Sequence, residues 1–89
     1  MTIDDWRQRI DEIDRKLLVL FNERTHCAIE IGKIKQAMQI GVVDPARERD
    51  IIRKVLEENS GPLDGEAVRR LFERLIEECR RVESDHETL

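Results

Sequence analysis

The amino-acid sequence predicts an all-α fold: three helices per chain, a long first helix, and a homodimeric helical bundle. Two observations predict the helices. The 89 residues include 40% charged residues but only four Gly and two Pro, so few positions favour turns. Apolar residues also recur at spacings of three and four, which is the helical period. A third observation predicts the dimer, because this apolar stripe is longer than one small chain can cover.

The first predicted helix begins after Thr2, which can cap it, and Asp5 completes a capping-box pattern. No Pro interrupts the next 33 residues, and their only glycine is Gly32. A heptad seam runs through them without a slip. Its members are Trp6, Ile10, Ile13, Leu17, Leu20, Arg24, Cys27, Ile31, Ile34 and Met38.

The length of this seam predicts the homodimer. The helix would be about 50 Å long, whereas a compact chain of this size has a radius of gyration of about 12 Å. The segment 17–21 is apolar on all sides, so it needs cover from more than one direction. We therefore expect two long helices to pack together.

Two shorter helices complete a single domain over residues 1–89. Asp44 can cap the second helix, and Pro45 suits its first position. The third helix begins near Asp64, and the polar segment 83–89 is expected to fray. The expected inward faces are Ile51, Ile52, Val55 and Leu56 in the second helix, and Val68, Leu71, Phe72, Leu75, Ile76, Cys79 and Val82 in the third.

Composition excludes several classes of function. A net charge of −4 is a poor match for nucleic acid. No apolar run reaches the ~18 residues of a membrane span, and the acidic start of the chain is unlike an export signal. Cys27 and Cys79 lack metal-binding or disulfide-scaffold spacing, so we expect two buried thiols in a cytoplasmic protein without a metal.

Charged residues interrupt the apolar stripes at Arg24, Lys35, Glu48 and Glu83. Buried charges are unfavourable unless they are paired or bind something. Two of them have an ordinary explanation: Arg24 could set the seam register, and Glu48 could pair with an Arg. Asp44 and Arg47 could likewise be only a cap and a surface charge.

Together these residues favour a site for a small, multiply charged anion. The sequence offers no activated nucleophile, because Ser60 and Ser84 have no neighbouring base and His26 points away from Cys27. We expect the site to bind and polarise its ligand rather than attack it.

The sequence resembles the all-helical chorismate mutases, the AroQ class, over roughly residues 3–83. The order and spacing of four segments support the resemblance. They are Trp6-Arg7-Gln8-Arg9-Ile10-Asp11-Glu12-Ile13-Asp14, Leu20-Phe21-Asn22-Glu23-Arg24, Ile31-Gly32-Lys33-Ile34-Lys35 and Val43-Asp44-Pro45-Ala46-Arg47-Glu48.

The resemblance implies conversion of chorismate to prephenate, in phenylalanine and tyrosine biosynthesis, by a concerted Claisen-type rearrangement without a cofactor. The cationic pocket would lie at the interface of an intertwined homodimer. Arg24 would bind one substrate carboxylate, with help from Arg47 and from Arg7 of the other subunit. Lys35 would donate to the ether oxygen of the breaking bond.

The resemblance also assigns acidic and third-helix positions. Glu48 would accept from the ring hydroxyl, with Asp44 nearby, and Cys79 and Glu83 would complete the pocket. Two residues depart from the common pattern: Cys79 replaces a small polar residue, and Glu83 replaces Gln. Only a protonated Glu83 can donate to the ether oxygen, so activity should fall as pH rises through neutrality.

Three other functions remain open. Isochorismate-pyruvate lyases share the fold and a similar cationic pocket. A non-catalytic, mutase-like regulatory or docking module of an aromatic-pathway enzyme is the second alternative. A purely structural coiled-coil dimer is the third, and the inward positions of Arg24, Lys35 and Glu48 disfavour it.

Overall fold

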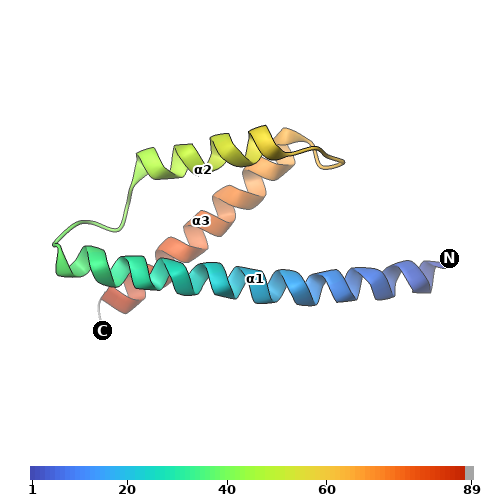
Figure 1. Cartoon of the computed structure of the whole chain (residues 1–89), viewed down its shortest axis with the longest axis horizontal. Coiled ribbons are helices and arrows are strands. Elements are labelled where there is room, and N and C mark those ends of the chain that lie inside the picture. Colours follow the sequence, from blue (N-terminus) through green and yellow to red (C-terminus); the bar gives the residue numbers. More distant parts are fainter. Residues whose placement is uncertain (88–89) are drawn as a thin grey trace.

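In the computed structural model of the chain, three helices follow one another as α1 (Ile3–Ala37), α2 (Pro45–Glu58) and α3 (Gly65–Glu87) (Figure 1). The structure describes the backbone of residues 1–87 and the side chains of residues 1–85. Within these residues there is no strand, and no helix is long and apolar enough to cross a membrane. The predicted all-α class, with three helices and a long first helix, is confirmed.

Side-chain caps set the beginnings of all three helices, and those at Thr2 and Asp44 are the caps that the sequence predicts. The backbone N–H of Asp5 donates to Thr2 Oγ1 at 3.1 Å, and that of Thr2 donates to Asp5 Oδ2 at 2.8 Å. This is a complete capping box. Asp44 and Asp64 each accept from a backbone N–H three residues on, at 3.1 and 2.8 Å.

The end of α1 is a Schellman motif. The N–H of Ile40 donates to the carbonyl of Lys35 at 2.8 Å, and that of Gln39 donates to the carbonyl of Gln36 at 3.1 Å. The motif requires a left-handed residue, and Gln39 takes that role with a φ of 59°. The chain therefore leaves the helix at Gln39, without the glycine that usually occupies this position.

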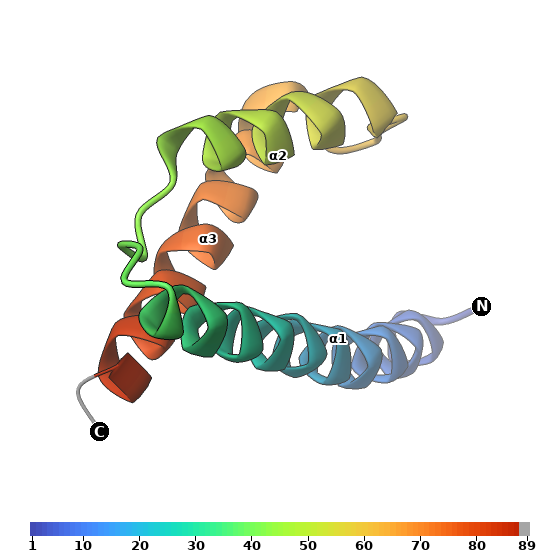
Figure 2. The ribbon, with the colours of Figure 1, turned by 60° about the vertical axis from the view of Figure 1, so that its left-hand side comes forward.

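The helices form an open triangle rather than a compact bundle. Helix α3 packs against the C-terminal half of α1 and against α2, whereas α1 and α2 lie apart (Figures 1 and 2). The chain measures 54 × 27 × 14 Å, with a radius of gyration of 16.1 Å. The expected value for a compact chain of this length is about 12 Å.

The small core lies where α3 meets its neighbours. The buried apolar side chains are Ile52, Val68, Ile76 and Cys79. Two expectations about burial are wrong for the single chain. Leu71 lies about 100° around α3 from the buried face and is 58% exposed. Cys27 is exposed because it lies on the seam of α1, away from the face that packs on α3.

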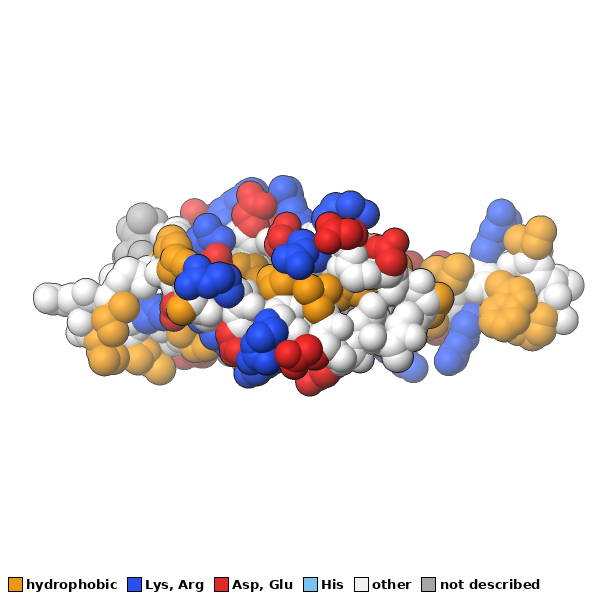
Figure 3. Space-filling view, turned by 90° about the horizontal axis from the view of Figure 1, so that it is seen from above, with side chains coloured by type: hydrophobic (Ala, Val, Ile, Leu, Met, Phe, Trp, Pro, Cys, Tyr) orange, Lys and Arg blue, Asp and Glu red, His pale blue; other side chains and the backbone are white. Residues whose placement is uncertain are grey.

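The N-terminal half of α1 projects from the triangle. Every residue from Ile3 to Phe21 is exposed, including the large seam residues Trp6, Ile10 and Leu17. In Figure 3, charges of both signs cover the face that carries α2, and hydrophobic side chains are visible at the projecting end of α1.

The C-terminal segment differs from expectation. Helix α3 continues past Glu83 to Glu87, so the expected fraying does not begin at Glu83. Glu83 is 8% exposed, because packing against α1 holds this turn in place. The remainder of the predicted frayed segment, 88–89, lies outside the described residues.

Candidate active site

A cavity of about 240 Å³ lies between the C-terminal half of α1, the start of α2 and the C-terminal half of α3. Seven of the eight predicted site residues line it, and Arg7 does not. The lining residues are Arg24, Cys27, Ala28, Ile31, Lys35, Val42, Asp44, Arg47, Glu48, Ile51, Ile76, Cys79, Arg80 and Glu83.

Arg24 reaches from α1 to α3. Its Nη1 donates to Cys79 Sγ at 3.2 Å. The hydroxyl of Thr25 lies 3.4 Å from the same sulfur and also donates to the carbonyl of Phe21 at 2.8 Å. Cys79 thus accepts from Arg24, which suits a sulfur that is a weak donor, and the contact holds the guanidinium inside the cavity.

Lys35 is positioned by the end of α1. Its carbonyl belongs to the Schellman motif, and its Nζ donates to the carbonyl of Val42 at 3.2 Å. The loop between α1 and α2 therefore folds back over this half-buried ammonium group. The contact keeps Lys35 at the wall of the cavity rather than extended into solvent.

The first turn of α2 contributes Asp44 and Arg47. Asp44 Oδ1 accepts from the backbone N–H of Arg47, so this acid is the helix cap as well as a lining residue. Arg47 Nη1 lies 3.2 Å from Asp50 Oδ2. Hydrogen bonds from Arg53 and then Lys54 lower the pKa of Asp50, so this carboxylate stays charged beside Arg47 at neutral pH.

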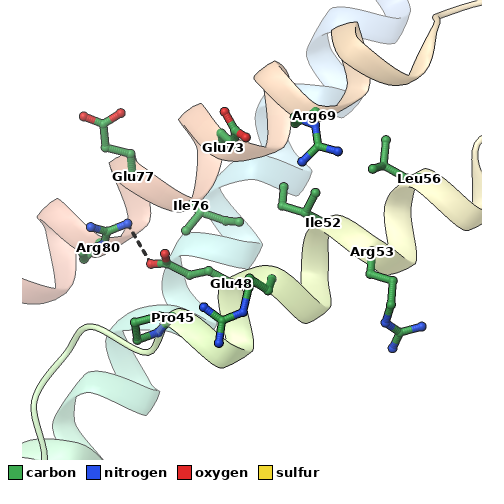
Figure 4. Close-up of a pocket in the computed structure, with 11 residues that line it drawn as sticks. Pro45, Glu48, Ile52, Arg53, Leu56, Arg69, Glu73, Ile76, Glu77 and Arg80 are labelled. Atoms are coloured by element: carbon green, nitrogen blue, oxygen red, sulfur yellow. Dashed lines mark ion pairs between the residues drawn. The ribbon is translucent and has the colours of Figure 1, made fainter.

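Glu48 is paired across the molecule with a residue that sequence reasoning missed. Arg80 Nη2 lies 2.7 Å from Glu48 Oε1, which joins α3 to α2 (Figure 4). A weak signal was present: Arg80 lies four residues after Ile76 and three before Glu83, on the cavity face of α3. The adjacent Arg81 conceals that signal, because two consecutive arginines are typical of an ordinary charged surface.

Glu83 lies against the backbone of α1 at Gly32. A Cβ at Gly32 would lie 3.3 Å from Glu83 Cγ, which is closer than ordinary van der Waals contact. Glycine therefore allows α3 to approach α1 here. The buried Glu83 thus packs on α1 about one helical turn before Lys35.

Arg7 lies far from this cavity within the chain. Its side chain is 74% exposed, and its Nη1 lies 3.9 Å from Asp4 Oδ1. Along a straight helix, Arg7 and Lys35 are about 42 Å apart. One chain cannot bring them to a common site.

The cavity within one chain has one more cationic than acidic side chain, which suits an anion. Arg24, Lys35, Arg47 and Arg80 line it, against the acids Asp44, Glu48 and Glu83. Within the described residues, no group of three or more His, Cys, Asp or Glu side chains could hold a metal ion. Ile31, Ile51 and Ile76 add apolar walls that could contact a ring.

A larger cleft of about 680 Å³ lies between α2 and α3 (Figure 4). It shares Glu48, Ile76 and Arg80 with the cavity but lacks Arg24 and Lys35. Arg53 and Arg69 in this cleft pair with acids of their own helices. Arg49 is a further cation of the cleft, so the cavity differs from it by holding Arg24 and Lys35 rather than by its net charge.

Comparison with known proteins gives the family. The family model described as chorismate mutase type II matches residues 6–84. The chain belongs to this family. It is 35% identical to the chorismate mutase of Methanocaldococcus jannaschii, over 90% of this chain and 82% of that protein.

Two further relatives extend the comparison. The bifunctional chorismate mutase/prephenate dehydratase of Neisseria gonorrhoeae is 42% identical over 86% of this chain. The chain spans only about a fifth of the length of such bifunctional relatives. The solved chorismate mutase of Thermus thermophilus matches 92% of this chain and 93% of its own, with 29% identity and a TM-score of 0.91. The three-helix triangle is therefore the family fold.

Proposed function

We propose that this chain is a chorismate mutase that converts chorismate to prephenate by a concerted Claisen-type rearrangement. One observation carries the proposal: Arg24, Lys35, Arg47 and Glu48 line a single cavity in a chain of this family. The reaction needs no nucleophile and no cofactor, so a site of fixed charges is sufficient.

The proposed mechanism has two parts. Arginines hold the substrate carboxylates, because a guanidinium is permanently charged and binds carboxylates bidentately. Arg24 and Arg47 would thereby select the compact chair-like conformer. Lys35 donates to the ether oxygen, where negative charge develops as the C–O bond breaks. Glu83, when protonated, donates to the same oxygen.

The ring of the substrate would be oriented by the acidic residues. Glu48 accepts from the ring hydroxyl, with Asp44 nearby, and Cys79 lies beside Arg24 at the opposite wall. We also propose a cytoplasmic location, which the two free thiols, Cys27 and Cys79, favour.

We further propose that the active form is an intertwined homodimer in which Arg7 enters the partner's cavity. The chain exposes 7154 Å², whereas a compact monomer of this mass exposes about 5,400 Å². The exposed surface includes the apolar seam of α1. Antiparallel pairing of two α1 helices would cover this seam and bring Arg7 toward Arg24 and Lys35 of the other chain.

Incubation with chorismate, followed by NMR identification of the product, tests the function. We expect prephenate, and Lys35→Ala and Arg24→Ala should each lower kcat/KM by at least about 100-fold while leaving the protein folded. Lys33→Ala is a matched control, because Lys33 lies on the same turn of α1 but pairs with Glu30 outside the cavity.

Two results would contradict the proposal. A folded protein without mutase activity would favour a binding module. A protein that instead releases pyruvate from isochorismate would be a lyase of the same fold.

A further inference from the structure

The ion pair between Glu48 and Arg80 differs in geometry from the ion pairs that form along single helices. These pairs join residues three or four apart on one helix, and most involve exposed side chains. Glu48 and Arg80 instead join α2 to α3 at 2.7 Å, and their side chains are 30% and 36% exposed. Ion pairs within one helix on the surface contribute little to stability. The pair of Glu48 and Arg80 instead fixes one helix relative to another.

The location of the pair connects it with the site. Both residues line the cationic cavity and also the larger cleft on the other side, so the pair forms part of the wall between them. Figure 4 shows the two side chains pointing toward each other across the gap between α2 and α3, beside Ile76. A shift of either helix would move the Glu48 carboxylate relative to Arg24 and Lys35.

The chemistry of the pair leaves the Glu48 carboxylate able to bind a further group. A carboxylate has acceptor capacity on two oxygens, so Glu48 can be held by Arg80 at Oε1 and still accept a hydroxyl proton. The Nε of Arg80 is buried and has no hydrogen-bond acceptor within the described residues. Because this nitrogen is buried, the contact of Arg80 with Glu48 is made by an outer nitrogen of the guanidinium, Nη2.

We propose that Arg80 is a positioning residue for the rearrangement, which orients the Glu48 carboxylate toward the ring hydroxyl of chorismate. This inference rests on the proposed mutase function. Arginine suits the role because its charge is permanent and its planar group fixes the direction of the carboxylate. The hydroxyl contact exists both in the bound substrate and in the transition state, so its loss should raise KM more than it lowers kcat.

The test compares neighbouring arginines. Arg80→Met keeps the aliphatic stem, and we expect it to lower kcat/KM about tenfold, mainly through KM. Arg80→Lys should recover part of this loss. Arg81→Met is the matched control, because Arg81 pairs with Glu78 on its own helix and lies outside the cavity; we expect a change below about twofold.

A double substitution separates positioning from direct binding or simple stabilisation. If Arg80 acts through Glu48, then Arg80→Met should change kcat/KM by less than about twofold in a Glu48→Gln background. An undiminished loss in that background would overturn the proposal. So would a lowered melting temperature with unchanged kinetics, because that result would mean that the pair only joins two helices.

The activity of the wild-type protein distinguishes failure of this inference from failure of the proposed mutase function. An inactive wild-type protein would overturn the mutase function and this inference together. An active wild type with a fully active Arg80→Met variant would overturn this inference alone. If Arg80→Met does not fold, Arg80→Gln in the same two backgrounds gives the same comparison.

Discussion

Single side chains decide where the charges of the cavity lie, and the sequence shows most of them as interruptions of apolar stripes. Arg24, Lys35, Glu48 and Glu83 are predictable on that ground, and all four line one cavity. The pairing of Arg80 with Glu48 could not be predicted, because the two residues are distant in sequence and the angle between α2 and α3 brings them together. Helical periodicity specifies a face, but it does not specify which residue of another helix that face meets.

Gly32→Ala should lower activity without lowering the stability of the protein. The added methyl would press on Glu83 Cγ at 3.3 Å, so the carboxyl must move and we expect kcat/KM to fall about tenfold. Alanine favours a helix over glycine by about 1 kcal/mol, which should offset the crowding in the free energy of unfolding. Gly41→Ala is the control, because nothing lies within 4 Å of the position that its methyl group would take. Equal kinetics for both variants would exclude a role for this contact.

The acid at position 83 should make the activity depend on pH. A protonated Glu83 can donate to the ether oxygen, whereas the ionised form would repel the charge that develops there. We therefore expect kcat/KM to fall as rising pH ionises Glu83, and Glu83→Gln to flatten the profile while it keeps activity. Rate profiles of the two proteins between about pH 5 and 9 test this. Superimposable profiles would mean that Glu83 has no part in catalysis.

At the scale of the helix, beginnings are easier to predict than packing. Thr2, Asp44 and Asp64 cap the three helices because capping depends on a few adjacent residues. The exposure of Leu71 and Cys27 could not be predicted, because both lie on apolar stripes but away from the line where α1 and α3 cross. The position of that crossing depends on close approach at Gly32, which periodicity does not reveal.

The end of α1 offers a stabilising substitution. Gln39 adopts a φ of 59° in the Schellman motif, where a side chain is unfavourable and glycine is not. We expect Gln39→Gly to raise the free energy of unfolding by about 0.5 kcal/mol, after the greater flexibility of glycine in the unfolded chain is included. Urea titration measures this. Lys33→Gly, in the exposed interior of α1, should instead destabilise by about 1 kcal/mol, and a loss of similar size at Gln39 would contradict the argument.

For the whole molecule, the open shape agrees with a chain that needs a second copy to cover its apolar seam. The sequence indicates that the seam outruns a single core, and in the open triangle the residues from Ile3 to Phe21 are indeed exposed. We expect sedimentation at micromolar concentration to give about twice the chain mass of 10.5 kDa. A folded helical monomer under these conditions would contradict the proposed dimer.

Subunit mixing tests whether the two chains share each site. Arg7→Ala and Lys35→Ala proteins should each be inactive, but a hybrid dimer would contain one site with both residues intact. After complete exchange of equal amounts, we expect about a quarter of the wild-type activity. Arg9→Ala is the control for Arg7, since Arg9 forms its own surface pair with Glu12. Absence of recovery after proven exchange would place Arg7 outside the site.

The projecting half of α1 has a consequence for how the protein folds. Because the chain leaves Trp6, Ile10 and Leu17 exposed, much of the favourable burial must come from a second molecule. Folding would then be a bimolecular reaction, and the apparent stability would depend on concentration. Each tenfold dilution should lower the free energy of unfolding per dimer by about 1.4 kcal/mol. The denaturation midpoint should therefore move to lower urea on dilution, and the refolding rate should rise with protein concentration.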